Sequence, residues 1–233
     1  MYRQVDNNGY LGGRAEFPAT NIAVAQSGQL DAIVALERIG TRLTFARNQE
    51  IYAEGDSTGC WYKVISGTVR ISKLLADGRR YIAEFCFAGD CFGLDNTRER
   101  LFSAEAVGEV AVMRLPRHAS EQVIDQNPAL ARLLRETMMR DLANAHGRML
   151  LLGRMTAAER VATFLIEMFE RCDRTKRLDL PMSRNDIADY LGLTIETVCR
   201  VLSGFKRDGI ITVPNAHSIE LRDREALEMA AEA

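Results

Sequence analysis

The chain has 233 residues, of which 47% are apolar and 27% charged, and its formal net charge is −2. This length can hold one large domain or two smaller ones, and the charge excludes a strongly basic protein, so any contact with nucleic acid needs a local positive surface. No run of eighteen apolar residues exists, and the first residues lack a basic segment followed by an apolar one. We therefore expect a cytoplasmic protein that does not associate with membranes.

The cysteines and histidines show no metal-binding pattern. The five cysteines form no C-x-x-C pair, and the three histidines have no zinc spacing. An odd number of cysteines without a secretion signal indicates free cytosolic thiols. The sequence therefore predicts no metal site and no cofactor.

The first half of the chain reads as an arm, a short helix and a series of strands. Residues 1–30 are rich in Gly, Asn and Ala and lack periodicity, which predicts a mobile or loosely docked arm. A short helix is expected at 31–38. From 43 to 115, short β runs alternate with glycine turns, and strands are expected at residues 62–65, 68–75 and 81–87. Strands this short at this spacing predict a compact β-barrel or roll.

The period changes to that of helices after Pro116. Pro128 is expected to begin a long helix that runs to about Leu152, with apolar residues spaced 4, 4, 3, 4 and 3 apart. This narrow stripe is typical of a coiled-coil seam and predicts a dimer interface. The stripe consists of Leu134, Met138, Leu142, Ala145, Met149 and Leu152. A further helix is expected after Thr156, because Thr156 and Glu159 form a capping box.

The C-terminal segment has the pattern of two helices joined by a tight turn. Ser183 is placed to cap the first helix, Gly192 to end it, and Thr194 to cap a second helix over 195–207. The hairpin expected at 210–221 would then form a wing. The second helix is expected to bury Val198, Val201, Leu202 and Phe205 and to expose Glu196, Cys199, Arg200 and Ser203.

The exposed face of the second helix carries groups that can read base pairs. An arginine can donate two hydrogen bonds to guanine, and a glutamate can accept one from cytosine. Glu196 and Arg200 lie four residues apart and so share a face. Considered alone, the pair also fits an ordinary surface salt bridge. The caps, the turn and the wing around it favour DNA recognition.

Residues 183–202 resemble the recognition motif of the CRP/FNR superfamily of transcription regulators. The segments 54–56, 66–69 and 89–93 resemble the turns of its β-roll. The resemblance implies an α+β fold with an N-terminal β-roll of the cyclic-nucleotide-binding type, a long dimerisation helix and a C-terminal winged helix-turn-helix. We expect the arm at 1–30, the β-roll at 31–127, the dimerisation helix at 128–153 and the DNA-binding domain at 154–233.

The resemblance also implies a role for each position of the motif. It implies that bases are read by Ile195, Glu196, Cys199 and Arg200, and that phosphates are held by Ser183, Arg184 and Thr194. An apolar residue at 195 is similar to the FNR and FixK branches, whose half-sites are TTGA-like, although those branches usually carry serine in place of Cys199. Cys199, exposed at the DNA face, is also a possible redox position. The implied partners are double-stranded operator DNA, RNA polymerase and a second copy of the chain.

The sensor half lacks the groups with which CRP relatives bind a cyclic nucleotide. Leu94 stands where a ribose-binding glutamate is needed, and Leu101 stands where a serine would follow Arg100. Arg100 is therefore expected to be a surface charge. Residues 1–59 contain no cysteine, which excludes the iron–sulfur cluster of FNR.

The expected strands also contain no histidine that could bind haem, because the histidines at 118, 146 and 217 lie outside them. Cys86 and Cys91 are expected to be small core or loop residues. This pattern resembles the FixK type, which binds DNA and activates transcription without a small-molecule effector. Two alternatives stay open: a β-roll that binds another nucleotide or anion, and an enzyme or regulatory subunit. The second lacks a glycine-rich phosphate loop and a catalytic triad.

Overall fold

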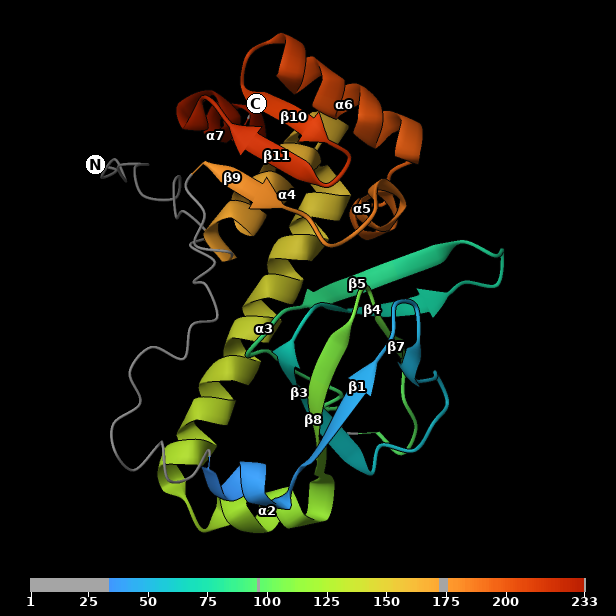
Figure 1. Ribbon diagram of the computed structural model, residues 1–233, viewed down its shortest axis with the longest axis vertical. Coiled ribbons are helices and arrows are strands. Elements are labelled where there is room, and N and C mark those ends of the chain that lie inside the picture. Colours follow the sequence, from blue (N-terminus) through green and yellow to red (C-terminus); the bar gives the residue numbers. More distant parts are fainter. Residues whose placement is uncertain (1–33, 96, 172–175, 233) are drawn as a thin grey trace, which may run out of the picture.

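The computed structural model places a β-rich unit beside one long helix, with a second, mainly helical unit at the end of that helix (Figure 1). It describes residues 34–95, 97–171 and 176–232. The predicted arm at 1–30 lies outside the described residues. Of the short helix predicted at 31–38, the described part is helical at 34–39.

Two antiparallel sheets face each other in the β-rich unit. Within the described chain one sheet has the order β1-β8-β3-β6 and the other β2-β7-β4-β5. Their strands are β1 (Thr41–Phe45), β2 (Glu50–Tyr52), β3 (Cys60–Ser66), β4 (Val69–Leu74), β5 (Arg80–Cys86), β6 (Cys91–Phe92), β7 (Ser103–Ala106) and β8 (Val110–Pro116). Val64, Val69 and Val112 are fully buried in the core between the sheets. The β-roll predicted from the glycine turns is confirmed.

Gly67 shows why glycine is needed at one of these turns. Its φ of +85° lies in the left-handed region, and a Cβ at this position would lie 2.3 Å from the carbonyl oxygen of Glu109. A side chain would therefore both strain the backbone and collide with the neighbouring strand. The turn between β3 and β4 depends on this residue.

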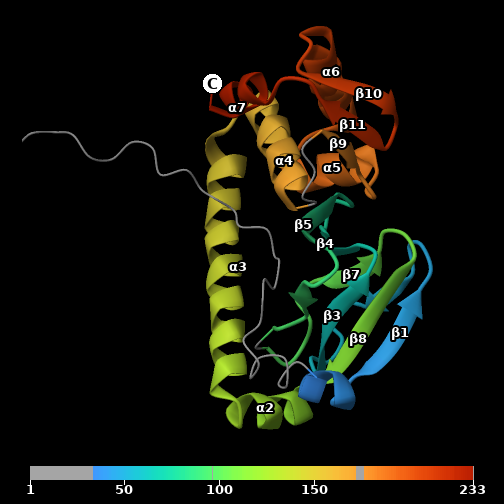
Figure 2. The ribbon, with the colours of Figure 1, turned by 60° about the vertical axis from the view of Figure 1, so that its left-hand side comes forward.

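The long helix α3 (Pro128–Arg154) follows a helix that the sequence did not predict, α2 (Arg117–Asp125). Asn127 caps α3 by accepting a hydrogen bond from the backbone N–H of Leu130 at 3.1 Å, and Pro128 occupies the first turn, where no N–H is required. The predicted helix is thus confirmed. Figure 2 shows α3 running beside the β-roll from α2 up to the C-terminal unit.

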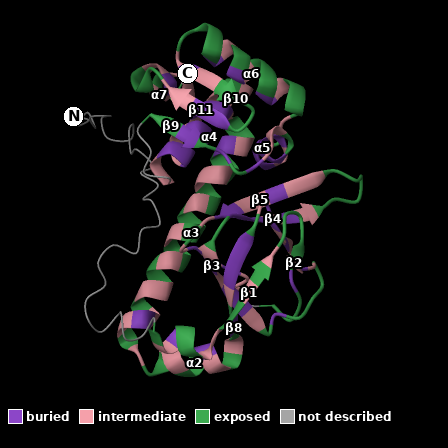
Figure 3. Ribbon diagram, in the orientation of Figure 1, coloured by how far each residue is buried: buried purple, intermediate pink, exposed green. Residues whose placement is uncertain are grey.

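The apolar stripe of α3 divides into an exposed part and a part used within the chain. Met138 and Met149 are 49% and 72% exposed, and Leu142 and Ala145 are also exposed. Leu134 and Leu152, which the sequence assigned to the same stripe, are partly buried and pack against the chain's own cores. Met139 and Leu150 are exposed apolar residues that the stripe did not include. Much of α3 is coloured as exposed in Figure 3.

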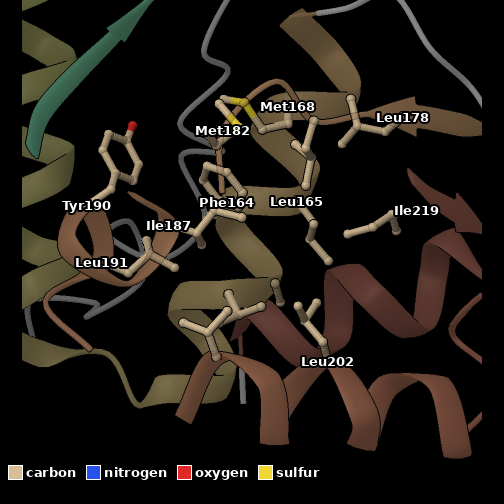
Figure 4. Close-up of a cluster of buried hydrophobic side chains, with 14 of the residues drawn as sticks. Phe164, Leu165, Met168, Leu178, Met182, Ile187, Tyr190, Leu191, Leu202 and Ile219 are labelled. Carbon is tan, nitrogen blue, oxygen red and sulfur yellow. The ribbon is translucent and has the colours of Figure 1, made fainter. Parts of the chain in front are cut away.

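The C-terminal unit packs its helices around a small antiparallel sheet. Its elements are α4 (Ala157–Arg171), β9 (Arg177–Asp179), α5 (Arg184–Leu191), α6 (Ile195–Arg207), β10 (Ile211–Asn215), β11 (Ser218–Leu221) and α7 (Arg224–Glu232). Phe164, Leu165, Ile187, Leu191 and Leu202 meet in its core (Figure 4). Burial of each such side chain contributes about 1.5–3 kcal/mol. The helix, turn, helix and wing predicted from the sequence are present, and so the predicted α+β class is confirmed.

Candidate nucleic-acid interface

The first helix of the pair, α5, begins with a complete capping box. The hydroxyl of Ser183 accepts a hydrogen bond from the backbone N–H of Asp186 at 3.1 Å, and Asp186 Oδ2 accepts from the backbone N–H of Ser183 at 3.0 Å. Gly192 ends the helix with φ +62°, which glycine adopts without steric cost. The backbone N–H of Leu193 then donates to the carbonyl of Ala188 at 3.0 Å. Local hydrogen bonds therefore fix both ends of α5.

The second helix, α6, presents a polar face to solvent. Thr194 caps it by accepting from the backbone N–H of Thr197 at 3.3 Å. The predicted reading residues Ile195, Glu196, Cys199 and Arg200 are all exposed, while Val198, Leu202 and Phe205 are buried on the opposite side. The structure therefore brings the four reading residues together on one open face, visible as the exposed outer side of α6 in Figure 3.

The side chains of Glu196 and Arg200 are not paired with each other on this face. Within the described part of the chain the two side chains form no ion pair, and Arg200 Nη2 instead donates to the hydroxyl of Thr197 at a long 3.4 Å. Hydrogen bonds from its own backbone N–H and from Thr194 lower the pKa of the Glu196 carboxyl, so it is charged at neutral pH. The surface-salt-bridge alternative is therefore not the arrangement seen, and both groups are available to a ligand.

The three residues predicted to hold phosphates differ in the hydrogen bonds that they already make within the chain. The hydroxyl of Ser183 donates to Asp186 Oδ2 at 2.7 Å, so both donors of Ser183 are used by the cap. Arg184 is partly buried, and its Nη1 has no hydrogen-bond partner within the described chain. Burial lowers the pKa of Arg184, and the Cys199 thiol acts against that shift. Thr194 is exposed at the start of α6.

Arg100, expected to be a surface charge, is a buried residue of the β-roll. It is 3% exposed; its Nη1 donates to the carbonyl of Gly93 at 2.6 Å and to Asp95 Oδ2 at 2.8 Å, and its Nη2 to the carbonyl of Cys60. Its guanidinium lies 4.3 Å from the ring centroid of Tyr52. The expectation was wrong because Asp95, five residues away, supplies a counter-charge that permits burial. The proximity of that acid was the available signal.

A cavity of about 600 Å³ lies between the β-roll, α3 and α4. Its charged lining groups are Glu84, Asp95, Asp141, Arg148, Glu167 and Arg171. Burial, and then the charge of Asp141, raises the pKa of Glu84 to about 7. Burial likewise raises the pKa of Glu167. Four acidic groups thus face two arginines in this cavity.

Cys86 and Cys91 of the β-roll are core or loop residues, as predicted. Cys86 is buried in the core between the sheets, and burial raises the pKa of its thiol; burial also raises the pKa of Cys91 to about 12. Among the described residues no group of three or more His, Cys, Asp or Glu could hold a metal ion. In the same residues no helix has the length and apolar composition needed to cross a membrane.

Comparison with known proteins places both units in described families. Residues 42–127 match the cyclic nucleotide-binding domain, and residues 159–230 match the Crp-like helix-turn-helix domain. The chain is 42% identical over 214 residues to the nitrogen fixation regulation protein FixK of Azorhizobium caulinodans, a match that covers 90% of this chain and 86% of that protein. It is 39% identical over 215 residues to FixK of Bradyrhizobium diazoefficiens, covering 91% of this chain and 90% of that protein.

A solved structure agrees with these sequence matches. The structure of FixK2 from Bradyrhizobium japonicum superposes with a TM-score of 0.80 at 42% identity, covering 84% of this chain and 98% of that one. The matched relatives are regulators and not enzymes. From the identity, the coverage and the two matched domains it follows that this chain is a transcription regulator of the CRP/FNR family, similar to its FixK members.

Proposed function

We propose that the protein binds a palindromic TTGA-like operator as a homodimer and activates transcription with RNA polymerase, in the cytoplasm and without a small-molecule effector. The observation that carries this proposal is the open face of α6, where Glu196 and Arg200 are exposed and not paired with each other. Similarity to the FixK regulators supports it. A two-fold symmetric reader matches a palindromic site, and the exposed apolar face of α3 supplies the surface for pairing.

The proposed readout assigns each exposed group to a part of the DNA. Arg200 donates to guanine O6 and N7, and Glu196 accepts from the paired cytosine. Ile195 contacts a thymine methyl group, and Cys199 contributes to the outer base preference. Phosphate contacts come from the α6 N-terminus and from Arg184, whose Nη1 is buried without a partner in the described chain and would have to turn outward to reach a phosphate.

Thr194 contributes at that same N-terminus, where the backbone N–H groups and the helix dipole favour a phosphate. Ser183 could reach a phosphate only after releasing Asp186, which now accepts both of its donors. We therefore place the phosphate contacts mainly on Arg184 and Thr194.

Effector independence is supported by the hydrogen bonds that both terminal nitrogens of Arg100 already make within the β-roll, although its Nε is buried without a partner in the described chain. Arg100 already donates to a carboxylate and two carbonyls, so a cyclic phosphate would have to displace Asp95. Leu94 and Leu101 offer no polar group in exchange. In the adjacent cavity four acidic groups outnumber two arginines, which does not favour an anion.

A second candidate function is a ligand-responsive regulator whose altered β-roll binds another nucleotide or an anion. The cavity of about 600 Å³ favours it, because its size suits a small molecule. A ligand bound there would raise the melting temperature by mass action. A screen of nucleotides and small anions by thermal unfolding separates the two candidates.

The proposal is tested by footprinting and fluorescence anisotropy with the purified protein. We expect protection of a TTGA-like palindrome, and affinity for it about a thousandfold or more above that for random DNA. Millimolar cyclic AMP should change neither the operator affinity nor the melting temperature. Equal affinity for operator and random DNA would contradict sequence-specific binding, and a shift of several degrees with cyclic AMP would contradict effector independence.

Cys199 is proposed as a redox-sensitive position on the DNA face. Its thiol is exposed one residue before Arg200. Peroxide would convert the thiol to a sulfenic acid with release of water, and further oxidation adds negative charge that DNA phosphates repel. We expect peroxide to weaken operator binding by the parent protein and to have little effect on Cys199→Ser. Equal sensitivity of the two proteins would show that this thiol is not the target.

A further inference from the structure

Two carboxylates of α5 are bound by two arginines of the β-roll, across the junction between the two units. Asp186 Oδ1 accepts from Arg80 Nη2 at 2.6 Å and from Arg70 Nη1 at 3.2 Å. Asp189 Oδ2 accepts from Arg80 Nε at 2.8 Å. In Figures 1 and 2 strands β4 and β5, which carry the arginines, lie directly below α5. One arginine thus bridges two successive turns of the helix.

The arginine side of this cluster is firmly held within the β-roll. Arg70 Nε donates to Glu105 Oε2 at 2.7 Å, and its Nη2 donates to Asn48 Oδ1 at 3.3 Å. Arg70 and Asp186 are 8% and 4% exposed, so the ion pair between them is buried. Buried, hydrogen-bonded charge pairs of this kind have defined geometry. The position of Asp186 is therefore fixed by contacts with the sheet as well as by its own helix.

The cluster is ionised at neutral pH. Burial by itself would raise the pKa of Asp186, but hydrogen bonds from Ser183 and the charges of Arg70 and Arg80 lower it overall. Burial would lower the pKa of Arg80, but Asp189 and Asp186 raise it overall. The charge-assisted hydrogen bonds are thus present under physiological conditions.

The same helix is held at its other end. The Tyr190 ring lies 5.0 Å from Phe85 of β5 and 5.7 Å from Phe164 of α4, centroid to centroid. The guanidinium of Arg148, from α3, lies 3.6 Å from the same ring and donates to its hydroxyl. Figure 4 shows Tyr190 at the edge of the C-terminal core. α5 therefore contacts the β-roll through Asp186, Asp189 and Tyr190, and α3 and α4 through Tyr190.

The orientation of α6 follows that of α5. Gly192 and Leu193 join the two helices in a tight turn, closed by the hydrogen bond from Leu193 N to the Ala188 carbonyl. Leu191 and Val198, one from each helix, are fully buried in the common core. A rotation of α5 relative to the β-roll would therefore carry the base-reading face with it.

We propose that Arg70 and Arg80 are positioning residues for DNA recognition: by binding Asp186 and Asp189 they hold α5, and with it α6, in one orientation relative to the β-roll. Since the two reading helices of a dimer must match two half-sites at a set spacing, a fixed orientation of α6 favours binding to the full operator. The DNA part of the inference rests on the proposed function, whereas the contact itself does not.

The test compares Arg80→Gln with Arg79→Gln. Arg79 is the adjacent residue in the hairpin, and among the residues that the structure describes it pairs only with Asp77, at the surface, so it controls for loss of one charge. Hydrogen exchange of residues 184–191 is measured in the free protein. Anisotropy is measured on a palindromic operator and on DNA with one half-site, which requires only one reading helix.

Arg80→Gln is expected to increase exchange in α5 and to weaken binding to the palindrome by about tenfold, with half-site affinity within about twofold of the parent. Arg79→Gln should match the parent in every measurement. Arg80→Lys, which keeps the charge but cannot bridge both carboxylates, should give an intermediate loss. Asp189→Asn combined with Arg80→Gln should add less than the sum of the single effects.

Two results would overturn the inference. One is unchanged exchange in α5 with parental affinity for the palindrome. The other is an equal loss on palindrome and half-site, which would indicate a destabilised domain and not a lost orientation. A parent protein that binds no operator would contradict the proposed function instead, and the exchange measurement would still decide whether the arginines hold α5.

Discussion

The double variant Met138→Glu, Met149→Glu is expected to be monomeric and to bind the operator at least about a hundredfold more weakly than the parent protein. Both side chains lie on the exposed face of α3, at 49% and 72% exposure. In a parallel helix pair each carboxylate would face its symmetry mate in an apolar seam, where burial of unpaired charge is costly. A monomer binds one half-site at a time and so loses the gain from simultaneous binding, which is about 10²–10⁴-fold.

The control is Met138→Leu, Met149→Leu, because this exchange keeps an apolar side chain of similar volume. We expect the control protein to be dimeric and to bind the operator as the parent does. Sedimentation velocity gives the oligomeric state, and anisotropy gives the affinity. A glutamate variant that sediments as a dimer would show that the dimer interface does not lie on this face of α3. Leu134 and Leu152 are not changed in this test, because they already pack within the chain.

The Arg200→Ala variant is expected to weaken specific binding by about 1–3 kcal/mol and to relax the preference at one base pair of each half-site. Arg200 is exposed, and within the described chain its guanidinium has only the long contact to Thr197. Its removal therefore costs little stability, and the loss should be confined to the matched base pair. Affinities for operators with each base exchanged in turn would identify that pair.

Arg184→Ala provides the comparison, since Arg184 is assigned to phosphate. It should weaken binding about equally on all sequences and reduce the salt dependence of binding by about one phosphate contact. Titrations of both variants on operator and random DNA at several salt concentrations distinguish the two roles. If both variants lost the same affinity on operator and random DNA, the assignment of Arg200 to a base and of Arg184 to a phosphate would be wrong.

Features that depend on neighbours within about ten residues could be predicted from the sequence. The caps at Ser183 and Thr194, the stop at Gly192 and the start of α3 at Pro128 each involve a side chain and a backbone group a few positions away. The exposed and buried faces of α6 follow from its period. These local rules placed the candidate base-reading residues on one surface. The helices α2 and α7 and the strand β9 were missed, and within the stretch expected to hold short strands β1, β2, β6, β7 and β8 were not predicted individually. These elements span only two to nine residues and carry too little periodicity.

Tertiary contacts determined the surroundings of the charged residues. The sequence cannot indicate that Asp186 meets Arg70 and Arg80, because the partners are 116 and 106 positions apart and either arginine could equally face water. The burial of Arg100 depended in the same way on the arrangement of Asp95 and two carbonyls around it. A charge enters the interior only where several partners converge, and that convergence is a property of the packed chain. Caps, turn and period thus predict the two helices and the exposed face of the second, whereas packing decides what holds them in place.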